Sequence, residues 1–180
     1  MDLSNPTLLH AEDLQKVVVD IDVSVGGKPA GTMTLEFWPD QALATVRNFL
    51  QYAAEGFYDG KTFHRVISGF MIQGGCPTGT GTGSGPRGTI PGEFGSGASR
   101  SHKRGVISMA RSQHPDSASC QFFICHADSD FLDGQYASFG ALISGEETLD
   151  KVAGVRTGSQ DRPADDETCV IDAMRLRSRV

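Results

Sequence analysis

Two stretches of this chain combine hydrogen-bonding side chains with large apolar ones at spacings that could do chemistry. The first covers residues 63–75 and reads FHRVISGFMIQGG, and the second covers residues 119–124 and reads SCQFFI. Both are rich in β-branched and aromatic residues, which favour strands. An arginine, glutamines and aromatic rings on strands suit the binding of an uncharged peptide. Such a site is expected to bind and bend its ligand, not to hydrolyse it.

Side chains alternate across a β-strand, so the two faces of each stretch can be separated from the sequence. One face combines polar and apolar groups: Phe63, Arg65, Ile67, Met71, Gln73, Gln121 and Phe123. The other face is wholly apolar: Val66, Ile72, Phe122 and Ile124. We expect the apolar face to cover a closed core. Ordinary core packing is also the expectation for Phe63 and Phe122.

Arg65 decides between a binding site and an ordinary exposed strand. A lone arginine on a strand is most often a solvated charge. Here Phe70, Met71 and Phe123 accompany it, and a glutamine could accept a hydrogen bond from one of its five donors. This pattern favours a guanidinium that is held in place for binding.

The rest of the pattern predicts a mainly β fold. Apolar and polar residues alternate over 17–25, and Gly26-Gly27 then turns the chain into a second run that ends at Phe37, which indicates a β-hairpin. Further strands are expected at 62–67, 70–74, 106–110, 121–126, 139–143 and 170–176. Helices are expected between Asp40 and Gly56 and over 146–153. The prediction is therefore a closed eight-stranded antiparallel β-barrel with two flanking α-helices.

Domain organisation is expected to be simple. Residues 1–15 show no regular pattern and are predicted to be an N-terminal extension, followed by one domain at 16–180. Residues 78–97, rich in Gly, Thr, Ser and Pro, are expected to form a long surface loop.

Composition and charge exclude several classes of function. The net charge of −6 argues against a nucleic-acid surface, and the basic cluster at 100–104 is expected to be a solvated loop. No segment is apolar for long enough to span a membrane, and the acidic N-terminus does not resemble a secretory signal, so a cytoplasmic protein is expected. Four cysteines without CxxC spacing indicate buried, idle thiols, with no metal site, cofactor or disulfide framework.

The two stretches resemble the active-site strands of a cyclophilin, and the resemblance runs from about Val17 to Leu176. The stretches at 108–111 (SMAR) and 131–136 (FLDGQY) look more like bacterial members. The resemblance implies a peptidyl-prolyl cis–trans isomerase that acts on proline-containing peptides and on unfolded or flexible protein segments, and that assists protein folding.

The resemblance also assigns site residues. It places the catalytic set at Arg65, Gln73, Phe70 and Phe123. It places substrate contacts at Met71, Gly81, Ala110, Arg111, Ser112, Gln121, Phe131, Leu132 and Tyr136.

Three of these positions depart from the best-known family pattern. Arg111 replaces an asparagine, at a position that grips substrate mainly through its backbone. Phe131 replaces a tryptophan that is common in drug-sensitive members, and Tyr136 replaces a histidine. Reduced affinity for cyclosporin A is therefore expected, with catalysis retained.

Rival classes of function have weak support. The GxGxxG match at 83–88 has no preceding strand or following helix. His114, Asp116 and Ser117 are neighbours only in sequence, which does not indicate a catalytic triad. The alternative that stays open is a barrel that binds proline segments, or acts as a chaperone, without significant turnover.

Overall fold

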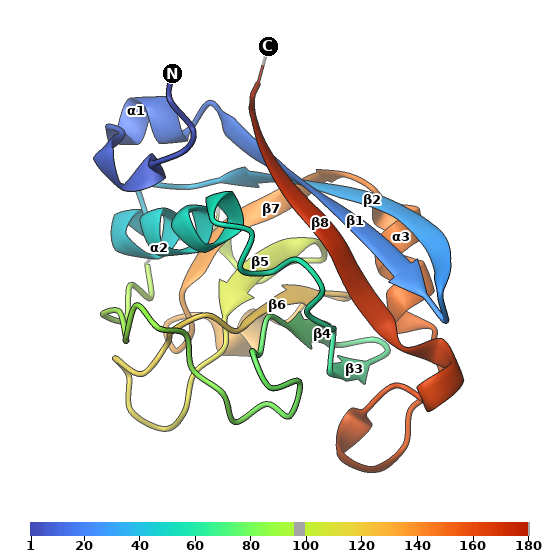
Figure 1. The fold of residues 1–180 in the computed structure, drawn as a ribbon. Coiled ribbons are helices and arrows are strands. Elements are labelled where there is room, and N and C mark those ends of the chain that lie inside the picture. The colour runs from blue at the N-terminus through green and yellow to red at the C-terminus, as the bar shows by residue number, and fades with distance from the viewer. Residues whose placement is uncertain (96–99, 180) are drawn as a thin grey trace.

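The computed structural model describes residues 1–95 and 100–179, and Figure 1 shows its ribbon. The last two residues of the predicted loop at 78–97 and the last residue of the predicted domain at 16–180 lie outside the described residues.

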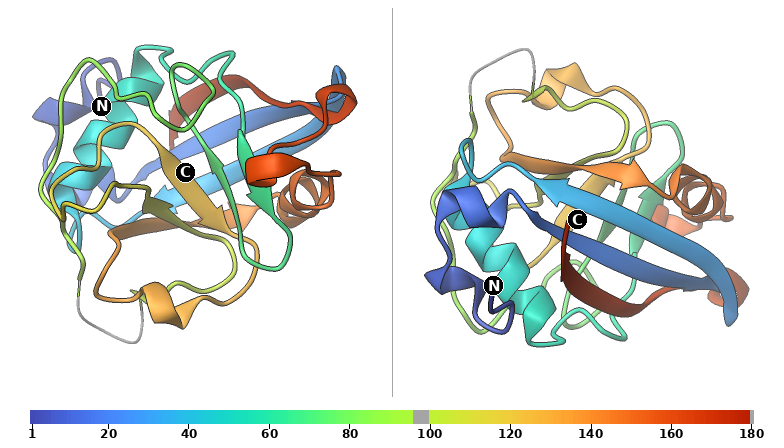
Figure 2. Two further views of the ribbon diagram at one scale, coloured as in Figure 1. Left: turned by 90° about the horizontal axis from the view of Figure 1, so that it is seen from below. Right: turned by 90° about the horizontal axis from the view of Figure 1, so that it is seen from above.

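The described part of the chain forms one antiparallel sheet of eight strands, as predicted. The strands are β1 (Val17–Val25), β2 (Lys28–Phe37), β3 (Arg65–Ile67), β4 (Met71–Gly74), β5 (Val106–Met109), β6 (Phe122–Cys125), β7 (Ser138–Ser144) and β8 (Cys169–Ser178). Their order across the sheet is β3-β4-β6-β5-β7-β2-β1-β8. The sheet curves around the core, which the two views of Figure 2 show from opposite sides.

The sheet is an open half-barrel, so the prediction of a closed barrel is wrong. β3 and β8 are the end strands, and no ladder joins them within residues 1–95 and 100–179. The chain before β3 meets β8 through an isolated bridge between Thr62 and Val170 and through single hydrogen bonds such as that from the Gly60 N–H to the Ile171 carbonyl. β3 is only three residues long, which is too short to continue this contact as a ladder.

Two helices lie where the sequence predicts them. α2 (Leu43–Ala54) lies on the N-terminal side of the molecule, and α3 (Glu146–Ala153) lies beside the far end of the β1–β2 hairpin (Figure 1). Shorter helical turns are α1 (Ala11–Leu14) and the 3-10 turns Pro6–Leu8, Asp130–Leu132, Ser159–Asp161 and Asp165–Glu167. No helix in the described ranges is both long and apolar enough to cross a membrane.

Aromatic rings fill the core between α2 and the sheet. Phe49 of α2 lies 5.2 Å from the Tyr58 ring, 5.3 Å from Phe139 and 5.4 Å from Phe122, measured between ring centroids. The Tyr58 hydroxyl donates a 2.8 Å hydrogen bond to the backbone carbonyl of Cys120, so its buried polar atom is satisfied. These contacts fix β6, and the chain that leads into it, against the core.

The N-terminal segment is more ordered than its sequence pattern indicates. Two short helical turns, Pro6–Leu8 and Ala11–Leu14, pack beside α2, and the Arg47 guanidinium donates a 2.8 Å hydrogen bond to the Leu9 carbonyl. Turns of three or four residues are too short to produce a recognisable hydrophobic period. The boundary at residue 16 stays a prediction.

Leu14 provides a test of whether this segment belongs to the folded core. Its side chain is fully buried in the main core, whereas Leu8 in the same segment is 76% exposed. Leu14→Ala is expected to lower the free energy of unfolding by about 2–5 kcal/mol, because it removes buried methyl groups and leaves a cavity. Leu8→Ala, the matched control, should change it by less than about 0.5 kcal/mol. Equal effects in urea denaturation would contradict this packing.

Candidate active site

The two faces of β3, β4 and β6 separate as the strand alternation predicts. Val66, Ile72, Phe122 and Ile124 belong to the main core. Phe63 also lies there, with its ring edge-on to Phe122, so the expectation of ordinary core packing for these two rings is confirmed. Its predicted place on the same face as Arg65 is wrong, because β3 begins only at Arg65 and strand alternation does not extend to Phe63. On the opposite face, a second apolar cluster contains Met71, Phe123, Cys125 and Leu132.

This second cluster borders a cavity of about 180 Å³, here called the central cavity. It is lined by nine residues, all of them expected site residues: Arg65, Phe70, Met71, Gln73, Ala110, Arg111, Phe123, Leu132 and Tyr136. Strand register explains part of this grouping, because Gln73 of β4 lies opposite Arg65 of β3 on one side and opposite Phe123 of β6 on the other. The cavity therefore has apolar walls and a polar rim.

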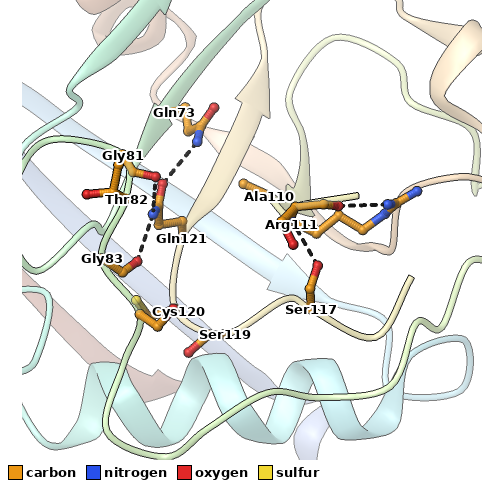
Figure 3. A pocket seen from close by; sticks show the side chains of 12 residues that line it. Gln73, Gly81, Thr82, Gly83, Ala110, Arg111, Ser117, Ser119, Cys120 and Gln121 are labelled. Atoms are coloured by element: carbon orange, nitrogen blue, oxygen red, sulfur yellow. Dashed lines mark hydrogen bonds between the residues drawn. The ribbon is translucent and has the colours of Figure 1, made fainter. Parts of the chain in front are cut away.

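A neighbouring cavity of about 260 Å³ lies beside it and shares Gln73, Ala110 and Arg111 with the central cavity. In Figure 3, Gln73, Gly81 and Gln121 lie on one side of it, and Arg111 and Ser117 lie on the other. Three expected site residues, Gly81, Ser112 and Gln121, line this cavity and not the central one.

A pair of glutamines holds the loop that walls the neighbouring cavity. The Gln73 side-chain amide donates a 3.1 Å hydrogen bond to the Gln121 side-chain oxygen. The Gln121 amide in turn donates to the Gly81 carbonyl at 3.0 Å and to the Gly83 carbonyl at 2.9 Å (Figure 3). Hydrogen bonds therefore hold both glutamine side chains in place. The network reaches the central cavity at Gln73.

Cys76 also holds this loop. Its sulfur accepts hydrogen bonds from the N–H groups of Gly81 and Gly83 at 3.3 and 3.4 Å, and it lies 3.3 Å from the Thr78 hydroxyl. Burial opposes a charge on the thiol, but hydrogen bonds from Thr78, Gly83 and Gly81 outweigh it and lower the pKa of Cys76 to about 6. All four cysteines are buried, as expected, but Cys76 is not idle.

Arg65 lies at the open rim of the central cavity, with its side chain 44% exposed. The expected hydrogen bond from Arg65 to a glutamine is absent from the described hydrogen bonds, and the Gln73 amide donates to Gln121. The Arg65 Nε instead lies 3.6 Å from the Asp161 carboxylate. Asp161 and its neighbour Gln160 have φ values of +57° and +58°, a left-handed conformation that is uncommon for residues other than glycine.

His64 lies next to Arg65 in sequence but points into the protein. Its Nδ1 atom is buried and has no hydrogen-bond partner. Burial, together with the positive charges of Arg162 and Arg65, lowers the pKa of His64 from 6.5 to about 4. The imidazole is therefore neutral at pH 7. His64 adds no positive charge beside Arg65.

A Ser–His–Asp chain of hydrogen bonds supports the wall of the central cavity. The His102 Nδ1 lies 2.7 Å from Asp133, its Nε2 lies 2.9 Å from the Ser108 hydroxyl, and its ring stacks behind Phe123 at 6.1 Å. These are the residue types of a hydrolytic triad. Ser108 is fully buried, however, so its hydroxyl cannot reach a substrate. The Ser108–His102–Asp133 hydrogen bonds therefore position Phe123 and do not provide a nucleophile.

His114, Asp116 and Ser117 form no such chain. The His114 Nδ1 accepts the Asp116 N–H, and the Ser117 hydroxyl donates to the His114 carbonyl, so the three residues stabilise a loop turn.

Phe131 differs from the other expected site residues because it lines neither cavity. Its ring is 67% exposed and lies 5.6 Å from the ring of Phe70, which does line the central cavity. Sequence reasoning missed Asp161, His102 and Asp133, and the loop residues Thr82, Gly83, Ser84, Ser117, Ser119 and Cys120 of the neighbouring cavity. Thr82, Gly83 and Ser84 lie in the long loop expected at 78–97, and Ser119 and Cys120 lie in the 119–124 stretch, but no strand or helix period marks these residues as part of a site.

Charged residues elsewhere are largely paired. Arg100, Lys103 and Arg104 of the basic cluster bind Asp40, Asp130 and Asp150. In residues 1–95 and 100–179 no group of three or more His, Cys, Asp or Glu side chains is arranged to hold a metal ion.

Comparison with known proteins identifies the family. The model of the cyclophilin type peptidyl-prolyl cis-trans isomerase/CLD family matches residues 19–175. Peptidyl-prolyl cis-trans isomerase B of Bacillus subtilis is 50% identical over 112 residues, which cover 62% of this chain and 76% of the relative. The Escherichia coli protein of the same name is 41% identical over 151 residues, which cover 76% of this chain and 89% of the relative.

Solved structures agree. The crystal structure of a cyclophilin type peptidyl-prolyl cis-trans isomerase of Cryptosporidium parvum superposes with a TM-score of 0.80 at 32% identity, covering 91% of this chain and 98% of that one. A second structure of that protein, in the presence of the dipeptide Ala-Pro, gives a TM-score of 0.79 at 33% identity, covering 90% and 99%. The chain therefore belongs to the cyclophilin family of peptidyl-prolyl cis–trans isomerases.

Proposed function

We propose that the central cavity holds the proline ring of a peptide substrate while Arg65 lowers the barrier to rotation about the preceding peptide bond. The observation that carries this proposal is the position of Arg65 at the rim of a cavity whose walls are Phe70, Met71, Phe123 and Leu132. The C. parvum relative solved in the presence of Ala-Pro supports a proline-containing ligand for this fold.

The chemistry needs no nucleophile and no metal. An Xaa-Pro bond prefers trans by only about 0.5–1 kcal/mol, but rotation crosses a barrier of roughly 18–20 kcal/mol because amide resonance is lost in the twisted state. When the bond twists, the prolyl nitrogen regains a lone pair and can accept a hydrogen bond. A guanidinium donor stabilises that state more than the planar ground state, and only such differential binding accelerates the reaction.

The geometry divides this work between two groups. The apolar walls hold the ring by burial, and their position is fixed because Phe123 lies between the His102 and Tyr136 rings. Arg65 Nε faces Asp161, which leaves the two terminal nitrogens of the guanidinium for the substrate. The proposed roles of Gln73 and Gln121 are supported by their shared hydrogen bond, which holds the Gln73 amide at the central cavity and the Gln121 amide at the neighbouring one.

The protein is proposed to act on flexible or unfolded segments that expose proline, and so to assist folding, since proline isomerisation is slow enough to limit folding rates. The central cavity opens at the surface and is rimmed by exposed Arg65, which suits an extended segment. Four unpaired cysteines favour a reducing compartment such as the cytoplasm. A binding module without turnover is the second candidate, because the apolar walls alone could hold proline.

Arg65→Ala separates these two candidates. It is expected to lower kcat/KM for an Xaa-Pro peptide by about 100-fold or more, roughly 3 kcal/mol, because the donor to the twisted amide is lost. Peptide affinity should change little, because Phe70, Met71 and Phe123 remain. Arg65→Lys should rescue little of the rate, since lysine keeps the charge without the planar fork.

Arg175→Ala, which removes an exposed arginine on β8, is the control for loss of charge and should keep full activity. The measurements are exchange rates and titrations by NMR. A folded Arg65→Ala protein with near wild-type turnover would reject the proposed role of Arg65.

The pH profile tests for the absence of a general acid or base. Arginine stays protonated, and His64 with a pKa of about 4 stays neutral, so kcat/KM should be flat between about pH 7 and 8. Cys76 has a depressed pKa of about 6, so its thiolate is favoured above that pH and is lost as the pH falls through it. We expect a modest fall in rate towards pH 6, which Cys76→Ser should abolish. A bell-shaped profile centred between pH 7 and 8 would contradict the mechanism.

Cyclosporin A is proposed to bind with reduced affinity. Phe131 offers an exposed ring beside Phe70 but lacks the indole N–H of tryptophan. Phe131→Trp is expected to tighten binding roughly 3- to 10-fold, in line with one added hydrogen bond of about 0.5–1.5 kcal/mol. Phe131→Leu, which adds no donor, should not tighten it. Equal affinities of the wild type and Phe131→Trp in calorimetric titration would show that this position does not limit drug binding.

A further inference from the structure

Arg111 stands where the two cavities meet. It follows β5 after Ala110, and it lines both the central and the neighbouring cavity. The family resemblance gives this position a role mainly through its backbone. The Arg111 side chain, however, also makes several contacts with other residues of the protein, which a role through the backbone does not require.

The guanidinium of Arg111 is bound by backbone carbonyls from two segments. Its Nε and Nη2 atoms both donate to the Gln135 carbonyl, at 3.0 and 2.8 Å. Its Nη1 atom donates to the carbonyls of Ser112 and Gln113, at 2.9 and 3.1 Å. None of the ion pairs in the described part of the chain involves Arg111, so its contacts are those of a planar fork of donors. The side chain thereby joins the 112–113 turn to the segment at 135–136.

Aromatic stacking extends this connection into the central cavity. The guanidinium carbon lies 4.8 Å from the centroid of the Tyr136 ring and 5.4 Å from that of Phe94. The Tyr136 ring meets Phe123 edge-on, with centroids 5.8 Å apart and an interplanar angle of 81°. Arg111, Tyr136 and Phe123 therefore form a continuous row of contacts that ends at a wall of the cavity.

We propose that the Arg111 side chain is a positioning residue, which holds Tyr136 and the 112–113 turn in place and so shapes the mouth of the central cavity for substrate binding. With its four contacts to carbonyls made, the guanidinium offers little to a substrate and acts through Tyr136. The inference rests on the proposed function of the central cavity. If Arg111 shapes the cavity mouth, its loss should affect mainly KM. The effect on kcat is assigned to Arg65 of β3.

The test compares Arg111→Ala and Arg111→Lys with the wild type. KM for an Xaa-Pro peptide is expected to rise about 5- to 10-fold in both variants, with kcat changed less than about twofold. Lysine should not rescue binding, because it cannot bond two segments and stack on a ring in one plane. Arg87→Ala, which removes an arginine from an exposed pair with Glu55, is the matched control and should leave both constants unchanged.

A double-mutant cycle with Tyr136→Leu tests whether Arg111 acts through that ring. Adding Arg111→Ala to Tyr136→Leu should raise KM little further, whereas independent roles would multiply the two effects. A rescue by Arg111→Lys, a loss confined to kcat, or multiplied effects would each overturn the proposal.

Peptide dissociation constants, measured for the same variants by NMR titration, keep this test separate from the proposed function. If the wild type binds peptide without turnover, the isomerase mechanism fails, but the change in affinity on Arg111→Ala still decides the role of Arg111. Unchanged affinity in a folded Arg111→Ala protein would reject it.

Discussion

The alternation of side chains across β4 and β6 is the constraint on which the site depends. Phe122 must face the main core, where its ring packs edge-on against Phe49 and Tyr58. Its neighbour Phe123 is then obliged to face the other way, into the central cavity. Ile72 and Gln73 stand in the same relation on β4. A shift of one residue in strand register would exchange core and cavity residues, so the stability of the core also specifies the site.

Loops complete what the strands begin, and polar contacts hold them. Gln121 and Cys76 both bind the loop at 81–83: Gln121 donates to its carbonyls, and Cys76 accepts from its N–H groups. The Asp133 carboxylate accepts from the Ser101 hydroxyl and from the N–H of His102, and it lies next to Leu132 in the cavity wall. Polar groups that are bound at several points in this way favour one arrangement of the loop. The rim is therefore pre-formed, whereas Arg65, the residue proposed to meet the substrate, lies partly exposed at the opening.

The sequence predicts the part of this structure that obeys a period. Strand alternation places Val66, Ile72, Phe122 and Ile124 in the core, and helical spacing places α3 at its observed bounds. Closure of the barrel depends on pairing between strands that are far apart in the sequence, and no local period reports such pairing. The predicted closed barrel is open because β3 ends after three residues.

Contacts between loops are equally invisible to periodicity. Asp161 reaches Arg65 from a loop with left-handed backbone, and His102 reaches Asp133 across 31 positions of sequence. The resemblance to cyclophilins supplies the grouping of site residues that strand parity alone could not, since Leu132 and Tyr136 lie on a segment without alternation. It does not supply contacts that depend on this chain's own residues, such as those of the Arg111 side chain.

The central claim is that this site turns proline bonds over and does not only bind them. Exchange spectroscopy of the cis and trans resonances of a short Ala-Pro peptide, with a small molar fraction of the wild-type protein, measures this directly. The account predicts interconversion many times faster than in the free peptide, together with shift changes of Met71 and Phe123 signals at higher peptide concentrations. Shift changes at those residues without any acceleration of exchange would contradict it.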